Sequence, residues 1–232
     1  MGTGQVSLRR LILVIACAGL LPIGSCSDDT VDPPPPDRPF YKDLSADGPR
    51  DNGLYNLQLA YNDRNITRYD ELLDADFVFF FSEYDVLNGT VAYWSRASEI
   101  NANKNLFDPN YSNPVQEPVQ DIDLSLVYPA GDDQWTQITP EDQVKYPGET
   151  WYTKSVIYEL TIQLPGDFQY VARNREADFV VRVATKDTKQ YWRIVVWEDD
   201  TGAGFSGLAR GGAGAPAVEP STWGRIKTLY WD

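Results

Sequence analysis

Histidine is absent from all 232 residues of the sequence, and the two cysteines, Cys17 and Cys26, lie close to the N-terminus. Without an imidazole, neither Ser-His-Asp nor Cys-His nucleophilic catalysis can operate. The commonest transition-metal ligand and the usual pH switch near neutrality are missing for the same reason. No thiol follows Cys26, which excludes a catalytic cysteine, an internal disulfide and a thiolate metal site from the rest of the chain.

Positive charge is also scarce, because 20 lysines and arginines face 34 acidic residues and leave a net charge of −14. Residues 1–25 hold two of the arginines and no acid, so the remainder carries 18 basic and 34 acidic groups. Affinity for nucleic acid comes largely from lysine and arginine on phosphates. Since the sequence has no basic patch, we expect no nucleic-acid partner. The length and an apolar fraction of 42% are sufficient for one domain with a proper core.

The N-terminus has the pattern of a secretion signal. Arg9 and Arg10 precede an apolar run from Leu11 to Leu21, and the small residues Gly24 and Ser25 follow it. The run is shorter than the roughly 20 apolar residues of a membrane-spanning helix. We therefore expect residues 1–25 to be a removable leader.

The end of this leader resembles the lipobox of bacterial lipoproteins, because Ile23-Gly24-Ser25 directly precedes Cys26. The resemblance implies cleavage before Cys26, a diacylglyceryl group on its sulfur and acylation, for example by palmitate, of the new N-terminus. One alternative is cleavage before Cys17, which would leave only Leu11 to Ala16 as the hydrophobic core of the leader. The other is an ordinary secretory peptide without lipid. Two or three acyl chains would anchor the protein stably to a membrane.

Residues 26–45 are rich in proline and aspartate and include four consecutive prolines. Such a segment favours an extended, solvated conformation, so we expect a tether between the lipid and a folded domain at residues 46–232. Ser27 follows the cysteine, and the absence of aspartate there resembles the sorting pattern of outer-membrane lipoproteins. The expected location is the cell envelope, at the outer membrane, facing the periplasm or the cell surface.

Helical spacing dominates the first part of the domain. It predicts a helix around residues 54–61, a second at residues 66–73 that Asn65 or Thr67 would cap, and a third from Arg96 to about Leu106. The aromatic run at residues 77–81 predicts a strand buried on both faces.

After residue 113 the apolar residues alternate with a period of two. This predicts strands over residues 122–128, 156–164, 177–184, 191–197 and 223–231, with turns at residues 165–167 and 187–189. Helices followed by consecutive strands with one apolar face each predict an α+β domain with an antiparallel sheet covered on one side.

The segments Leu57–Arg64, Tyr69–Leu73 and Asp76–Phe79 together resemble the opening of nuclear-transport-factor-2-like (NTF2-like) domains. This superfamily includes ketosteroid-isomerase-like and polyketide-cyclase-like proteins. Residues 94–107 are similar to its third helix, and residues 192–199 and 223–227 to its terminal strands. Over residues 50–232 the resemblance implies a cone-shaped, curved antiparallel sheet wrapped around the N-terminal helices, with a pocket at the wide end.

Catalytic residues are not evident in this pattern. Family enzymes often carry an aspartate base near the end of the first strand, where this sequence has aromatic residues and its nearest acids are Glu83 and Asp85. If the protein is an enzyme, Glu159 could act as the acid or base, although the alternation places it opposite the apolar face. Five aromatic residues are candidates for lining a cavity, with ordinary core packing as the alternative: Tyr61, Phe79, Trp94, Tyr158 and Trp197.

Two further motifs indicate loops. Gly202–Gly207 matches G-x-G-x-x-G, but the glycines and proline that follow prevent the helix that a dinucleotide site requires. The acidic pairs at residues 28–29, 132–133 and 199–200 lack calcium-loop spacing and are expected to be solvated turns. We expect no cofactor and no metal ion.

The sequence thus favours a membrane-anchored, non-catalytic module. Its expected partners are the membrane through Cys26, a small apolar ligand or an envelope protein, and a second copy of the chain as a further alternative. The competing hypothesis is a histidine-independent acid/base enzyme, such as an isomerase, cyclase or dehydratase, that acts on a small hydrophobic substrate.

Overall fold

The computed structural model describes residues 40–113, 116–142, 144–200, 218–220 and 222–231. The predicted leader, Cys26, the tether up to residue 39 and the Gly202–Gly207 motif lie outside these residues. The described residues belong to one compact unit that begins at Pro39. In this part of the chain no helix has both the length and the apolar character to cross a membrane.

Five α-helices and two short 3-10 turns occur in the described residues. The helices are α1 (Asp51–Asn62), α2 (Ile66–Leu72), α3 (Glu83–Leu87), α4 (Arg96–Phe107) and α5 (Trp223–Thr228), and the turns are Asp132–Gln134 and Pro165–Asp167. The strands are β1 (Leu73–Phe80), β2 (Tyr93–Ser95), β3 (Asp121–Val127), β4 (Thr136–Ile138), β5 (Trp151–Gln163), β6 (Gln169–Lys186), β7 (Lys189–Asp200) and β8 (Val218–Pro220).

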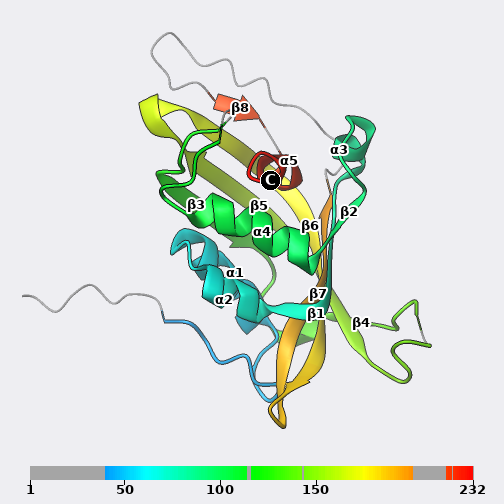
Figure 1. The fold of residues 1–232 in the computed structure, drawn as a ribbon. Coiled ribbons are helices and arrows are strands. Elements are labelled where there is room, and N and C mark those ends of the chain that lie inside the picture. Colours follow the sequence, from blue (N-terminus) through cyan, green and yellow to red (C-terminus); the bar gives the residue numbers. More distant parts are fainter. Residues whose placement is uncertain (1–39, 114–115, 143, 201–217, 221, 232) are drawn as a thin grey trace, which may run out of the picture. The chain divides into compact units, whose positions relative to one another are not determined.

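The strands form one sheet in the order β2-β1-β7-β6-β5-β3, with β4 beside β5 and β8 beside β6. Neighbouring strands are antiparallel except for the parallel pairs β1–β7 and β6–β8. The sheet is curved, and helices α1, α2 and α4 lie on its concave side (Figure 1). The predicted α+β class, with a curved and mainly antiparallel sheet around the N-terminal helices, is confirmed.

The first two helices follow the predicted spacing. Leu54, Leu57 and Tyr61 on α1 are fully buried. The side chain of Asn65 caps α2 by accepting a hydrogen bond from the Arg68 amide at 3.1 Å. Both helices thereby turn an apolar face toward the sheet, which creates the core of the unit.

The prediction that the aromatic run is buried on both faces is wrong. Strand β1 starts at Leu73, and its side chains alternate, so that Phe77 and Phe79 are buried while Phe80 is 38% exposed. The physical reason is that β1 lies between β2 and β7 in a sheet whose helices α1, α2 and α4 lie on the concave side. Phe80 lies on the opposite face, where its ring centroid is 6.2 Å from that of Tyr93.

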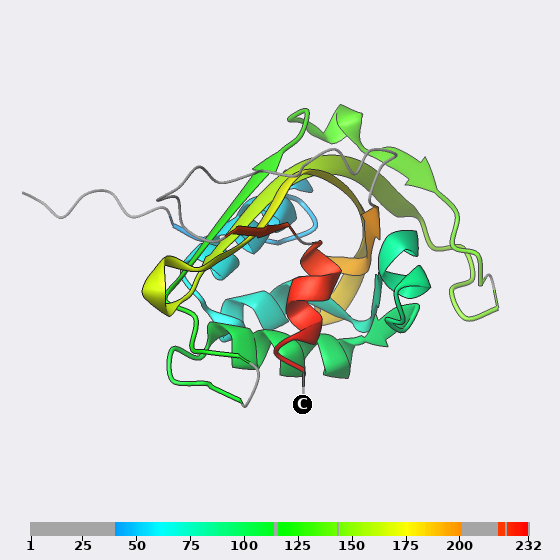
Figure 2. The ribbon, with the colours of Figure 1, turned by 90° about the horizontal axis from the view of Figure 1, so that it is seen from above.

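The C-terminal strand predicted at residues 223–231 is also wrong, because this segment contains helix α5. Thr222 directly precedes the helix, and its side chain caps it by accepting a hydrogen bond from the Arg225 amide at 3.0 Å. Four residues at helical spacing are fully buried: Trp223, Ile226, Lys227 and Tyr230. Helix α5 lies inside the curve of the sheet (Figure 2).

The segment just before α1, which we expected to belong to the tether, lies against β7. Ser45 forms a β-bridge with Tyr191, and the Trp192 amide donates to the Leu44 carbonyl at 2.8 Å. Tyr41 and Leu44 pack against the core. This segment therefore forms a wall of the unit beside the β6–β7 hairpin.

Candidate functional site

The five aromatic residues predicted from the sequence as pocket candidates all lie in the main hydrophobic core. Tyr61, Phe79, Tyr158 and Trp197 are fully buried, and Trp94 is 4% exposed. The Trp197 ring centroid lies 5.3 Å from that of Phe79 and 6.4 Å from that of Tyr61. The rings of Tyr61, Phe79 and Trp197 contact one another, and all five residues pack in the core, which is the alternative that the sequence offered to a cavity lining.

Helix α5 completes this packing with Trp223. Its ring centroid is 4.0 Å from that of Trp197 and 4.9 Å from those of Tyr61 and Tyr158. The indole Nε1 also donates to the Tyr61 hydroxyl at 3.1 Å. The C-terminal helix thus occupies the inside of the curved sheet.

One turn further along α5, Lys227 carries a fully buried ammonium group. Its Nζ forms an ion pair with Oε1 of Glu99 at 2.7 Å, and neither side chain is exposed. The same Nζ lies 3.5 Å from the ring centroid of Phe79 and 4.0 Å from that of Trp197, which adds cation–π attraction. Burial lowers the pKa of Lys227, and the neighbouring Glu99 carboxylate opposes that shift.

Glu99 is held by neutral donors as well. Tyr69 donates its hydroxyl proton to Oε1, and the Asn103 amide donates to the same oxygen at 2.8 Å. Tyr61 in turn donates to Asn103 at 2.6 Å. Burial, reinforced by Glu99, raises the pKa of both tyrosines far above the ordinary value, so they remain donors at neutral pH. The second carboxylate oxygen of Glu99 has no partner among the described residues.

Asp199 corrects another prediction, because it was expected in a solvated turn and is only 1% exposed within β7. It accepts hydrogen bonds from the Tyr158 hydroxyl at 2.6 Å and from the Gly224 amide at 2.9 Å. Burial raises its pKa to about 6.

Nearby Asp85, one of the acids beyond β1, accepts hydrogen bonds from the hydroxyls of Ser82 at 2.8 Å and Thr222 at 2.7 Å. Both carboxylates therefore fix the start of α5.

The other acids named from the sequence lie at the surface. Glu159 is exposed on the outer face of β5, away from the buried cluster. Asp132 is exposed in a 3-10 turn, where it accepts from the Arg50 amide at 2.8 Å. Across the described ranges, no three acidic, cysteine or histidine side chains gather in a way that could hold a metal ion.

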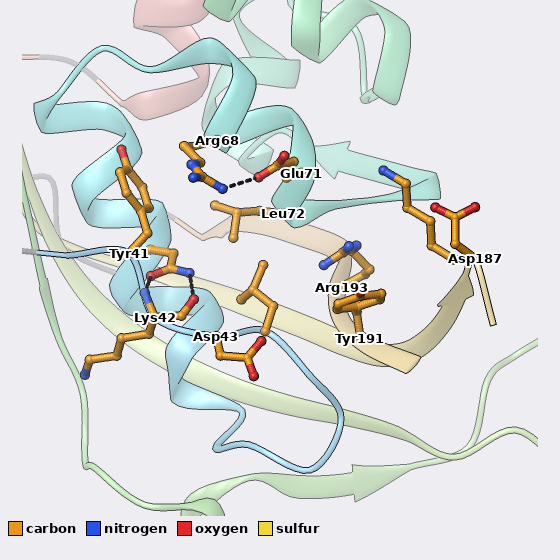
Figure 3. Close-up of a pocket in the computed structure, with 12 residues that line it drawn as sticks. Tyr41, Lys42, Asp43, Arg68, Glu71, Leu72, Asp187, Tyr191 and Arg193 are labelled. Carbon is orange, nitrogen blue, oxygen red and sulfur yellow. Dashed lines mark hydrogen bonds and ion pairs between the residues drawn. The ribbon is translucent and has the colours of Figure 1, made fainter. Parts of the chain in front are cut away.

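An open groove of about 510 Å³ lies elsewhere, between the segment before α1, helix α2 and the β6–β7 hairpin (Figure 3). A second recess of about 480 Å³ adjoins it across Asp43 and Tyr191. Neither recess includes any of the five predicted pocket residues. The groove is lined by Tyr41, Lys42, Asp43, Leu44, Asn56, Arg68, Glu71, Leu72, Lys186, Asp187, Tyr191 and Arg193.

Cationic residues from three parts of the chain line this groove. Arg68 is paired with Glu71 at 2.9 Å on the surface of α2. Lys42, Lys186 and Arg193, in contrast, form no ion pair within the part of the chain that the structure describes. The groove is thus a polar recess in which several charges lack a direct counter-ion.

The walls of the groove are fixed by hydrogen bonds. Asn56 on α1 accepts from the Lys42 amide and donates to its carbonyl, both at 2.8 Å, which holds the N-terminal segment in place. The Arg193 guanidinium lies 4.8 Å from the Tyr191 ring centroid and donates to the Trp192 carbonyl at 3.2 Å. Burial lowers the pKa of Arg193, against the opposing effect of Glu71.

Sequence reasoning missed this groove and the Glu99–Lys227 pair. The buried pair had one usable signal, since Trp223, Ile226 and Lys227 follow helical spacing. The groove had none, because its walls come from segments that only the tertiary fold brings together.

The comparisons with known proteins give a limited result. No protein-family model matches the sequence, and no curated protein matches it. Similar solved structures include an NTF2-like superfamily protein from Salmonella enterica serovar Typhimurium, at 13% identity and a TM-score of 0.41, covering 69% of this chain and 92% of that one. Another is an NTF2-like protein of unknown function in nutrient uptake from Rhodospirillum rubrum, at 11% identity and a TM-score of 0.38, covering 64% and 94%.

An NTF2-like protein from Cytophaga hutchinsonii is also similar, at 12% identity and a TM-score of 0.34, covering 64% of this chain and 92% of that one. These neighbours are of the class that the sequence resembles. At such identities the similarity concerns the arrangement of helices and strands alone.

Proposed function

We propose that this protein is a lipid-anchored binding module of the cell envelope that holds its ligand at the surface groove and catalyses no reaction. The observation that carries the proposal is the contrast between a filled interior and an open groove. Trp223 and Lys227 occupy the inside of the sheet without any exposed surface, whereas about 510 Å³ is accessible beside β7. Concave recesses with a few polar groups are where small ligands bind.

The anchoring part of the proposal is supported by the order of the leader. Arg9 and Arg10, the apolar run and Ile23-Gly24-Ser25 all precede Cys26 in the arrangement of a lipoprotein signal. Palmitate labelling combined with intact-mass measurement tests this directly. The mature chain should start at Cys26 and carry acyl chains. Cys17→Ser should behave like the wild type, whereas Cys26→Ser should stop lipid addition; a lipid-free mature protein would refute the anchor.

The absence of catalysis is supported by how the buried polar groups are used. Glu99 is engaged by Lys227, and Asp199 by Tyr158 and the amide of Gly224. The Glu99–Lys227 and Asp199–Gly224 contacts connect α5 to α4 and to the sheet, and the Tyr158–Asp199 contact joins β5 to β7. The groups that could transfer a proton are therefore committed to holding the C-terminal helix in place.

The binding part is tested with ligand retained through native purification and quantified by mass spectrometry. Tyr191→Ala should release the ligand, because it removes a ring that lines the groove. Tyr61→Phe is the matched interior variant, since it keeps the ring and removes only the buried hydroxyl. Retention in Tyr191→Ala together with loss in Tyr61→Phe would place the ligand inside the sheet and refute the proposal.

One observation favours the alternative of a histidine-independent acid/base enzyme. Asp199 has a pKa raised to about 6, and it lies 2.6 Å from the Tyr158 hydroxyl. A carboxyl group with such a pKa can donate and accept protons near neutrality. Substrate could reach it only after Trp223 and Gly224 had moved. An activity that disappears in both Asp199→Asn and Tyr158→Phe, while the fold remains intact, would favour the enzyme.

A further inference from the structure

The charges of the groove distinguish it from the rest of the molecule. The chain carries 34 acidic and 20 basic residues, yet the groove is lined by four cationic and three acidic side chains. Arg68 comes from α2, Lys42 from the segment before α1, and Lys186 and Arg193 from the two arms of the β6–β7 hairpin. In Figure 3 Arg68 lies close to Leu72 and Arg193 lies beside Tyr191, whereas the Lys42 side chain extends away from both, and its Nζ lies 3.8 Å from the Tyr55 ring centroid.

The acidic side chains of the groove are partly engaged. Glu71 accepts from Arg68 at 2.9 Å. Asp43 accepts from the Ser45 amide at 3.0 Å, and this hydrogen bond lowers its pKa. None of the three acidic side chains, Asp187 included, is within ion-pair distance of Arg193 in the described structure.

Arg193 is the best-defined cation of the groove. It is half-buried, its guanidinium lies on the Tyr191 ring, and its one hydrogen bond among the described residues goes to the Trp192 carbonyl. A guanidinium has five N–H donors in a planar fork that fits an oxyanion. Arg193 therefore has donors to spare, held in a fixed orientation by the ring.

Apolar surface lies beside these cations. Leu44 and Leu72 line the groove, and the half-buried Leu44 offers most of this apolar surface because Leu72 is only 2% exposed. The rings of Tyr41 and Tyr191 also line it. A ligand that fits both features has one anionic group and a short apolar body.

We propose that the groove binds a small organic anion, whose oxyanion contacts Arg193 and whose apolar part lies against Leu44. This inference rests on the proposed function and names its class of ligand. The oxyanion is a phosphate or a carboxylate, and its source is either a soluble metabolite or the headgroup of a membrane lipid.

Calorimetric titration of the full chain with four probes tests the ligand class. Hexyl phosphate should bind. Inorganic phosphate and hexanol, which each lack one half of the ligand, should bind at least about tenfold more weakly, since each lost interaction is worth roughly 1.4 kcal/mol or more. Hexyltrimethylammonium, which has the same chain and the opposite charge, should not bind. If the ammonium probe bound more strongly than hexyl phosphate, the inference that the ligand is an anion would be wrong.

Two variants with opposite expected effects on the Kd test whether hexyl phosphate binds in the groove, and a third serves as the control. Arg193→Gln should raise the Kd of hexyl phosphate at least about tenfold, because a charge-assisted hydrogen bond is lost. Glu71→Gln should lower the Kd, because it removes a like charge and frees Arg68. Arg173→Gln, on an exposed part of β6 beyond the groove, is the matched control and should leave the Kd unchanged. Equal affinities in all three variants would overturn the inference.

Competition by vesicles identifies the source of the anion. If the natural ligand is a lipid headgroup, phosphatidylcholine vesicles that contain phosphatidic acid should displace hexyl phosphate, and pure phosphatidylcholine should not. If it is a soluble metabolite, neither vesicle should compete, and the inference stands with that source. Failure of hexyl phosphate to bind at all would overturn the ligand class. The Tyr191→Ala and Tyr61→Phe measurement on retained ligand would still decide the proposed function.

Discussion

The interior of the sheet and the groove beside β7 both contain cationic side chains, but these differ in their exposure to water and in whether a carboxylate pairs with them. In the interior, Lys227 is unexposed and has the carboxylate of Glu99 at 2.7 Å. In the groove, Arg193 is half-buried and has no carboxylate at ion-pair distance among the described residues. A charge removed from water must be paired, whereas a partly solvated charge keeps its hydration until a ligand replaces it.

This difference means that the interior is fully packed and paired without a ligand, whereas the groove has space and unpaired charge that a ligand could fill. Around Trp223 the ring centroids of its neighbours lie between 4.0 and 4.9 Å away, which leaves no room for a substrate. Aromatic pairs of this kind each contribute roughly 0.5–1.5 kcal/mol beyond the area they bury. Substitutions in the interior should therefore reduce the stability of the fold, and substitutions in the groove should reduce binding with little effect on stability.

The largest effect is expected from Lys227→Met. The substitution keeps an unbranched apolar stem but leaves Glu99 buried without its cation. Breaking a buried ion pair by removing one partner costs roughly 3–5 kcal/mol. Urea denaturation of the variant and the wild type measures the loss in free energy of unfolding.

The double variant Lys227→Met/Glu99→Gln is its control. It removes both charges and keeps an acceptor for Tyr69 and Asn103, so it should recover a large part of the loss. A loss below about 1 kcal/mol in the single variant would show that water reaches Glu99, contrary to a closed interior.

The next effect concerns pH and the carboxyl group of Asp199. Its pKa in the folded protein is about 6, against an ordinary value of 3.8. Below about pH 4 the group is protonated in both states. Between about pH 4 and 6 the unfolded chain loses the proton while the folded protein keeps it, so stability falls as pH rises. The total is about 3 kcal/mol, at roughly 1.4 kcal/mol for each pKa unit.

Denaturation of the wild type and Asp199→Asn at several pH values between 4 and 7 checks this sign. Other carboxylates act in the opposite direction; hydrogen bonds and charge from Lys145 lower the pKa of Asp76, for example. Only the difference between the two proteins isolates Asp199. If the free energies of unfolding of the two proteins changed in parallel with pH, the carboxyl group of Asp199 would be hydrated and ionised in the folded state.

A smaller effect is expected where α5 approaches the sheet. A Cβ added at Gly224 would lie 2.6 Å from Cδ1 of Phe81 and 3.3 Å from Oδ2 of Asp85. Gly224→Ala should destabilise the fold by roughly 1–3 kcal/mol, because the ring or the helix must move. Thermal or urea denaturation gives the value.

Gly53 provides the matched control, because it lies within α1 and a Cβ there meets nothing within 4 Å. Gly53→Ala should raise stability by up to about 1 kcal/mol through helix propensity. If both alanine variants were stabilising, α5 would be loosely packed, and the interior would be open to ligands after all.

The sequence was a good guide to long elements and a poor one to short ones. Helix α4 and strands β5 to β7 carry their period over many residues, so their type was predicted correctly. Helix α5 has only six residues, so the helical spacing of Trp223 and Ile226 is too short to identify a helix from the sequence. Tertiary packing, including the cap at Thr222, selected the helix.

The candidate site was predictable only in part for a related reason. The five aromatic residues named as pocket candidates lie in the core, and none of them lines the groove. Glu99 and Lys227 are separated by 128 residues, and Ser45 meets Tyr191 through a single β-bridge. Such long-range pairs depend on the registers of all the strands between them, which no local pattern encodes.

The smallest effect is expected from the ion pair in the groove, Arg68–Glu71. The two side chains are 50% and 42% exposed and lie three residues apart on α2. A double-mutant cycle with Arg68→Gln and Glu71→Gln should give a coupling of about 0.2–0.5 kcal/mol, which high salt should reduce further. The same Glu71→Gln variant should therefore change anion binding without changing the fold. A coupling above about 1 kcal/mol that resists salt would make this pair a structural element like Glu99–Lys227, and the groove would then be as complete without a ligand as the interior is.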